Sequence, residues 1–130
     1  MLFRSLWHQV QWLKEAGVTD VVFLAGYRWE AIQDYFGDGQ AFGIRAHYSV
    51  EDSPLGRGGA IRNGFPLVPE EEDLVVVLNG DVITQEPFGS LSRRHEERKS
   101  ANPSHLATIM VVPFVSQDRK STRLNSSHVV

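Results

Sequence analysis

The sequence predicts an α/β protein with a mainly parallel sheet and helices on both faces. Segments with the apolar spacing of amphipathic helices alternate with apolar, strand-like segments along the chain. This order is typical of right-handed crossovers between parallel strands. Two of the strand-like segments, 21–24 and 74–78, are continuously apolar, which indicates strands that are buried on both faces.

The first helix and strand follow from local patterns. Leu6, Val10 and Leu13 recur at helical spacing, and Gly17 supplies a stop, so an amphipathic helix is expected over this stretch. The strand 21–24 comes next.

A second helix is expected over 29–36, where Gly37 ends it. Residues 44–50 then alternate between apolar and polar, which predicts a half-buried strand near an edge of the sheet. Its wet face carries Arg45, His47 and Ser49.

The second half of the chain continues the alternation. We expect a Gly-rich turn over 53–59, a short helix over 60–65 and an acidic loop over 70–73. A strand over 74–78, a helix over 87–99 and a last strand over 106–112 should follow. Pro66 is expected to close the short helix, because proline lacks a donor and clashes with the preceding turn.

The composition excludes several classes of function. The chain has no cysteine, and its five histidines show no ligand spacing, so neither disulfides nor a structural metal are expected. The formal net charge of -3 provides no basic surface for nucleic acid. No apolar run approaches the roughly 20 residues of a membrane-spanning helix, and no signal-peptide pattern is present. We expect a cytoplasmic domain that binds neither nucleic acid nor membrane.

Both ends of the chain read as foreign sequence. The stretch from Asp118 to His128 matches a translated short-read sequencing adapter, and Met1 to Ser5 match the end of its partner adapter. A frayed start and a polar disordered tail would have a similar composition. We expect 1–5 and 118–130 to be adapter-derived, 6–117 to be a partial domain, and the tail to pack on nothing.

Asn79-Gly80-Asp81 follows the most apolar segment of the chain. Asn-Gly is a strong hairpin signal, but the short run after it ends at Pro87, which favours a strand that leads toward a helix. At the carboxyl end of a parallel strand Asp81 would face the ligand crevice, where a carboxylate suits Mg²⁺. From the residues alone, Asp81 is either a metal ligand or part of a turn, and both alternatives stay open.

The segment 54–60 places Gly56, Gly58 and Gly59 just before a helix. Glycines at a helix start let backbone amides approach a ligand. A plain turn and helix cap would look the same, and the segment matches neither the Walker loop nor the dinucleotide fingerprint.

Together these segments resemble the nucleotidyltransferase family that makes nucleotide sugars, whose fold is Rossmann-like. The resemblance runs through most of 6–115 and is carried by His8-Gln9, Trp12-Leu13, Gly26-Tyr27, Tyr35-Phe36, Phe42-Gly43, Pro54-Leu55-Gly56, Gly58-Gly59-Ala60, Leu78-Asn79-Gly80-Asp81 and His95. The Leu-Gly-x-Gly-Gly-Ala pattern is most similar to the guanylyl branch, which includes mannose-1-phosphate and heptose-1-phosphate guanylyltransferases.

The resemblance implies transfer of a nucleoside monophosphate from an NTP to a sugar 1-phosphate, with release of pyrophosphate, by a guanylyl-, thymidylyl- or uridylyltransferase. Asp81 matches the aspartate that holds Mg²⁺ in the family. The nucleotide-binding residues that the resemblance implies are Leu55, Gly56, Gly59, Asn79 and Gly80. A homo-oligomer is compatible with it.

The chain also departs from the family. No residues before Leu6 match the family's first strand, its Gly-x-Gly-Thr-Arg-Leu loop or the downstream lysine. In the family that strand lies between those matched by 21–24 and 74–78, and the sugar-binding half lies beyond Val115. The catalytic residues are therefore unknown, and we expect this fragment to be inactive by itself. Arg57 stands where threonine is common, and an ion pair with Glu51 or Asp52 and a phosphate contact are both open.

Two other classes of protein are alternatives to an active transferase. A receiver or flavodoxin-like signalling domain needs an acidic pair after its first strand and a lysine after its last, and neither is found. A non-catalytic nucleotide-binding or regulatory relative of the transferases would share the fold, because folds outlive activities.

Overall fold

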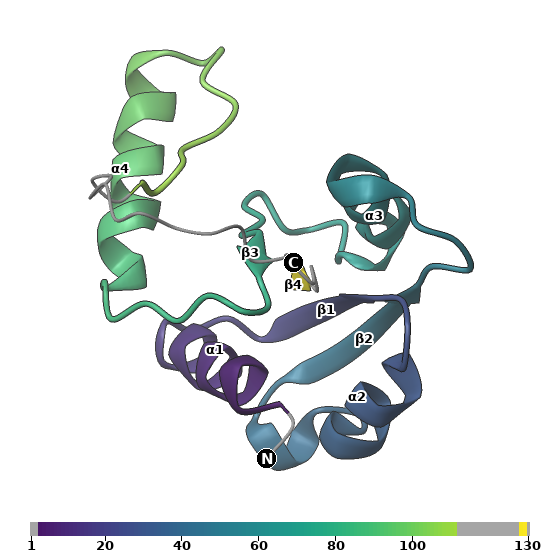
Figure 1. Cartoon of the computed structure of the whole chain (residues 1–130). Helices are drawn as coiled ribbons and strands as arrows, with labels where there is room; N and C mark the ends of the chain where they lie inside the picture. Colours follow the sequence, from purple (N-terminus) through teal and green to yellow (C-terminus); the bar gives the residue numbers. More distant parts are fainter. Residues whose placement is uncertain (1–2, 112–127, 130) are drawn as a thin grey trace, which may run out of the picture. The chain divides into compact units, whose positions relative to one another are not determined.

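The computed structural model describes residues 3–111 and 128–129. The chain divides into two compact units (Figure 1). Unit 1 comprises Met1–Ile83 and Ser126–Val130, and unit 2 comprises Thr84–Asn125. Each unit is described by itself.

Unit 1 is a sheet with helices on both faces (Figure 1). Its elements are α1 (Arg4–Glu15), β1 (Asp20–Ala25), α2 (Trp29–Phe36), η1 (Gln40–Phe42), β2 (Arg45–Val50), α3 (Gly56–Gly64), η2 (Phe65–Leu67), β3 (Leu78–Asn79) and β4 (His128–Val129). The predicted helices around Leu6 to Leu13 and over 29–36 are confirmed.

The strand order is β2-β1-β4-β3. Strands β1 and β2 pair in parallel over their full length, from Asp20 opposite Arg45 to Ala25 opposite Val50. Strand β4 runs antiparallel to both β1 and β3, so β1, β2 and β3 share one direction. The α/β class and the parallel sheet are therefore confirmed.

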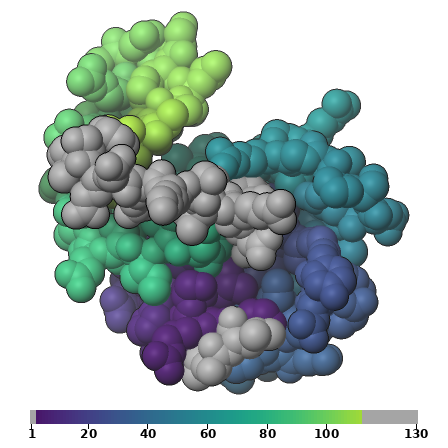
Figure 2. All heavy atoms as spheres, viewed as in Figure 1, coloured from purple at the N-terminus to yellow at the C-terminus, as the bar shows by residue number. Residues whose placement is uncertain are grey.

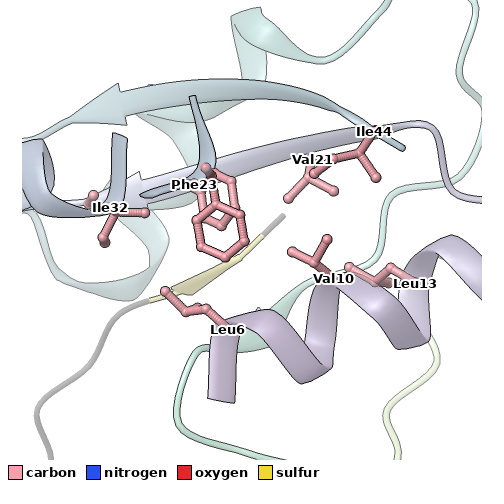
Figure 3. Packing of buried hydrophobic residues seen from close by; sticks show 9 residues of the cluster. Leu6, Val10, Leu13, Val21, Phe23, Ile32 and Ile44 are labelled. Atoms are coloured by element: carbon pink, nitrogen blue, oxygen red, sulfur yellow. The ribbon is translucent and has the colours of Figure 1, made fainter. Parts of the chain in front are cut away.

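Strand β1 is buried on both faces, as its continuous apolar sequence predicted. Val21 and Phe23 face α1 and α2, where they join the main core cluster with Leu6, Val10 and Leu13 (Figure 3). On the other face, Val22 and Leu24 pack against Ala60 of α3. Burial of apolar surface in these two layers is the main force that holds the unit together.

One detail of β2 was predicted wrongly. Ser49 was expected on a solvent-exposed face of the strand, yet this residue is only 5% exposed. Helix α3 covers this face, and Asn63 Nδ2 donates a hydrogen bond to Ser49 Oγ over 2.9 Å. A buried hydroxyl is tolerated because it has a partner.

The predicted strand 74–78 is also largely wrong, because only Leu78 and Asn79 are in a strand. Leu74 is 36% exposed and Val77 46% exposed. A strand needs a hydrogen-bonding neighbour, and among the described residues β3 is paired only with the two residues of β4. An apolar run without a paired neighbour does not form a regular strand.

Both chain ends contain residues in regular structure. Arg4 and Ser5, which belong to the predicted adapter-derived stretch 1–5, form the first residues of α1, and this does not test where the stretch comes from. The tail was expected to pack on nothing, which is wrong for His128 and Val129, since both pair with β1 and β3. These two residues occupy the position between β1 and β3, which the family resemblance gives to the family's first strand. An exposed strand edge can pair with another segment of chain, because backbone pairing does not depend on side chains. Residues 118–127 lie outside the described residues.

Unit 2 consists, in its described part, of α4 (Phe88–Ala101) and the irregular segment that follows. The helix matches the one predicted over 87–99. Thr108 joins the segment to the helix, because its Oγ1 lies 3.1 Å from His95 Nδ1 and 2.8 Å from His105 Nε2. The strand predicted over 106–112 is wrong for 106–111, where no strand forms, and Val112 lies outside the described part. Helices in the described regions are too short or too polar to span a membrane.

Candidate functional site

The carboxyl ends of the parallel strands define the candidate site. Strands β1, β2 and β3 end at Ala25, Val50 and Asn79. Because they run in the same direction, the loops that follow them emerge at one edge of the sheet. This edge is where ligands bind in open α/β sheets.

The turn after β3 contains three of the predicted site residues. Val82 N donates to Asn79 O over 3.1 Å, which closes a tight turn through Gly80 and Asp81. Gly80 is buried, whereas Asp81 is exposed. No strand follows within 80–87, so the turn does not form a hairpin.

A residue that no sequence pattern had singled out holds this turn. Gln9 on α1 is only 5% exposed, and its Nε2 donates to Asn79 O over 2.6 Å and to Val82 O over 2.5 Å. A signal was present in the sequence, since Gln9 lies three residues from Leu6 and four from Leu13, on the apolar face of the helix.

The Gly-rich segment forms the start of α3 rather than a turn before the helix. Helix α3 begins at Gly56, whose φ of 71° is left-handed and favours glycine. Leu55 precedes the helix and is 47% exposed, and its N–H donates to Glu51 Oε2 over 3.1 Å. A Cβ at Gly59 would lie 2.7 Å from Leu55 Cβ, so only glycine fits there without a shift. Figure 2 shows this teal segment at the molecular surface.

Arg57 is exposed on the first turn of α3. It forms no ion pair with any residue that the structure describes, so the pairing with Glu51 or Asp52, one of the two alternatives that the sequence left open, is not seen. Its guanidinium is therefore available to solvent or to an anionic ligand.

The predicted site residues form two groups at the same edge. Leu55, Gly56 and Gly59 lie together at the start of α3, and Asn79, Gly80 and Asp81 lie together after β3. The sheet order places β1 and β4 between β2 and β3, so the two groups flank the middle of the sheet.

The first loop at this edge carries two further conspicuous residues. Tyr27 is 95% exposed, and Arg28 adopts a left-handed φ of 61° before α2. Non-glycine residues in this conformation are uncommon and cluster at functional sites.

Asp81 is the residue that the family resemblance predicts as a metal ligand, and its carboxylate is exposed after β3. Within residues 3–111, no cluster of three or more acidic or histidine side chains could hold a metal by itself. A single exposed carboxylate fits Mg²⁺ nevertheless, because this ion keeps several waters and is commonly bound by one or two carboxylates together with substrate phosphates.

The opposite edge of the sheet holds a different charged cluster. Asp20, at the start of β1, accepts hydrogen bonds from Arg45 Nε over 2.8 Å and from Thr19 Oγ1 over 2.9 Å. His47 Nε2 lies 3.0 Å from the same carboxylate. The hydrogen bonds from Arg45 hold the pKa of Asp20 well below its usual range; desolvation opposes them, and His47 and Thr19 assist. This cluster lies at the amino ends of the strands and joins β1 to β2.

Comparison with known proteins agrees with this geometry. The family model described as nucleotidyl transferase matches residues 3–119. A D-glycero-alpha-D-manno-heptose 1-phosphate guanylyltransferase of Aneurinibacillus thermoaerophilus is 38% identical over 89 residues, which are 68% of this chain and 37% of that protein. A mannose-1-phosphate guanyltransferase of Neurospora crassa is 34% identical over 94 residues, 72% of this chain and 26% of the relative.

A second heptose-phosphate enzyme, from Campylobacter jejuni, is 41% identical over 71 residues, 55% of this chain and 30% of that protein. The chain thus spans between a quarter and two fifths of the length of these curated relatives. The family model covers most of the chain, and the parallel sheet carries the glycine-rich and Asn-Gly-Asp segments at one edge. The chain therefore belongs to the nucleotidyl transferase family.

Proposed function

We propose that the complete protein containing this domain transfers a nucleoside monophosphate from an NTP to a sugar 1-phosphate, giving a nucleotide-diphospho-sugar and pyrophosphate. The names of the relatives support GTP as the nucleotide. Their two sugars, mannose and a heptose, support a hexose or heptose 1-phosphate as the acceptor class.

One observation carries the proposal to this chain. Asp81 presents an exposed carboxylate in a closed turn at the carboxyl edge, and the start of α3 emerges at that same edge. Gly56 and Gly59 keep the backbone of this start free of side chains, so that a nucleoside can approach it closely.

In the proposed site, Asp81 would hold Mg²⁺, and this ion, when bound, would supply positive charge to offset the charge of the phosphoryl oxygens. Leu55 offers exposed apolar surface to the base, and Gly80 keeps the turn compact. Exposed Arg57 supplies a positive charge near the phosphates. The transfer depends on positioning and charge neutralisation, so these residues need not form covalent bonds.

The complete gene product with Asp81→Asn tests the proposal. Pyrophosphate release is measured with GTP, UTP or dTTP, each paired with mannose 1-phosphate or a heptose 1-phosphate. We expect the substitution to lower turnover about a hundredfold or more, as loss of a charge-stabilising group commonly does.

Asp73→Asn is the matched control, because Asp73 is an exposed acid in the acidic loop. It should retain the wild-type rate. Undiminished turnover by Asp81→Asn would assign the metal to another residue. Nucleotide binding by a wild-type protein that shows no turnover with any pair would favour the non-catalytic alternative.

A further inference from the structure

We propose that Gln9 is a positioning residue that fixes the Asn79–Val82 turn and thereby orients the Asp81 carboxylate. The inference rests on the proposed function, since it concerns the same acidic residue. Gln9 does not itself contact the proposed substrates. It acts through the two backbone carbonyls that bracket the turn.

The geometry of the side-chain amide supports this role. Its nitrogen has two hydrogens, and two carbonyls receive them, that of Asn79 at 2.6 Å and that of Val82 at 2.5 Å. These carbonyls lie at the first and last residues of the turn that contains Gly80 and Asp81. One amide group therefore bridges the two ends of the turn.

The orientation of the amide follows from its partners. Both partners are carbonyl oxygens, which only accept hydrogen bonds, so the reversed orientation would set oxygen against oxygen. Gln9 Oε1 has no hydrogen-bond partner among the described residues, although it is buried. An unpartnered buried acceptor is costly. The side chain nevertheless keeps the orientation in which its nitrogen donates both hydrogen bonds.

The amide is also attached to a rigid support. Gln9 is followed by Val10, which is fully buried, and Leu6 and Leu13 anchor the same helix in the core. A group that is held by a packed helix loses little further freedom when it orients a neighbour. The turn itself lies outside any long strand, since β3 has only two residues, so it depends on a tether of this kind.

Gln9→Met in this chain tests the tether directly. Methionine has a similar size and no donor, so the turn should loosen while the core stays packed. We expect NMR order parameters of Gly80 and Asp81 to fall from the rigid range near 0.85 to below about 0.6, with those of β1 unchanged. Gln33→Met makes the same change at an exposed position on α2. It should leave the order parameters of Gly80, Asp81 and β1 unchanged.

The complete protein provides the second readout. Gln9→Met should raise the Mg²⁺ concentration for half-maximal turnover by about tenfold, because the Asp81 carboxylate is no longer held in place. The KM for the sugar phosphate should stay unchanged. A general loss of folding would not produce this separation. Gln9→Glu keeps the side-chain length but turns an acceptor toward both carbonyls, and it should reproduce both effects.

The outcomes separate the two proposals. Wild-type order parameters in both Gln9 variants would overturn the tether, whatever the activity. An unchanged Mg²⁺ dependence in both variants would overturn its role in orienting Asp81. If instead Asp81→Asn leaves turnover intact, the proposed function of this site is wrong, and the order parameters still decide whether Gln9 holds the turn.

Discussion

Asp20 shows how a single half-buried carboxylate joins two strands. Its side chain is 9% exposed, and it accepts hydrogen bonds from Thr19 and Arg45. The pKa of Asp20 is lower in the folded state than the value of about 3.9 in an unfolded chain. Its contribution to stability is therefore present at neutral pH and is lost as the pH falls below about 4 toward the folded pKa.

Asp20→Asn should lower the free energy of unfolding by about 1 kcal/mol at pH 7, because the Arg45 side chain is 67% exposed and solvent screens the pair. The difference from wild type should narrow as the pH falls from 4 to 2. Urea unfolding across this range measures it. Asp34→Asn, at an exposed position on α2, serves as the control. A difference that is constant with pH would show that charge on Asp20 does not contribute.

At the same scale, the chemistry of the candidate site could be read only in part from the sequence. Asp81 was indicated by its place after the apolar run 74–78, and Gly56 and Gly59 by their glycine-rich segment and by the family resemblance. Gln9 was overlooked, since its partners are two backbone carbonyls about seventy residues away. Local patterns carry no information on such partners.

At the scale of the element, the packing of α3 depends on one glycine. Gly64 is buried, and a Cβ there would clash with Leu24 and lie 3.4 Å from Ser49 Cβ. Gly64→Ala should therefore destabilise the unit by about 1–3 kcal/mol, the usual cost of overpacking. Thermal or urea unfolding measures the change.

Gly58→Ala is the matched comparison in the same helix. Nothing lies within 4 Å of its Cβ position, so the gain in helix propensity should stabilise the protein by about 0.5–1 kcal/mol. Opposite signs for the two substitutions are the expected result. Stabilisation by both would show that α3 does not pack tightly on β1.

Elements were predictable where local pattern and tertiary contact agree. The prediction for α2 matched its bounds, because its apolar face and Gly37 are both local signals. The runs 74–78 and 106–111 are also rich in apolar residues, yet only Leu78 of these residues lies in a strand. Their state depends on the availability of a neighbouring strand, which no local pattern records.

At the scale of the whole molecule, the two units differ in how much they bury. Unit 1 contains every buried residue of the described chain, whereas no described residue of unit 2 is buried. Helix α4 has no buried residue along its length. A helix of this size is only marginally stable without packing.

Hydrogen exchange should therefore separate the units. We expect backbone amides of α4 to exchange at least a hundredfold faster than those of Val22 and Phe23, since local opening requires less free energy where little surface is buried. NMR-detected exchange at neutral pH measures both sets at once. Equal protection would show that the two units unfold as one.

The sheet order also determines the sequence in which the molecule can assemble. Strands β1 and β2 bring together residues 25 positions apart, whereas β4 pairs Val129 with Phe23 across most of the chain. Closing a longer loop costs more entropy, and contacts between distant residues form slowly. The β1–β2 pair, with α1 and α2 against it, should therefore form early. Strand β4, which lies between β1 and β3, should be the last to enter the sheet.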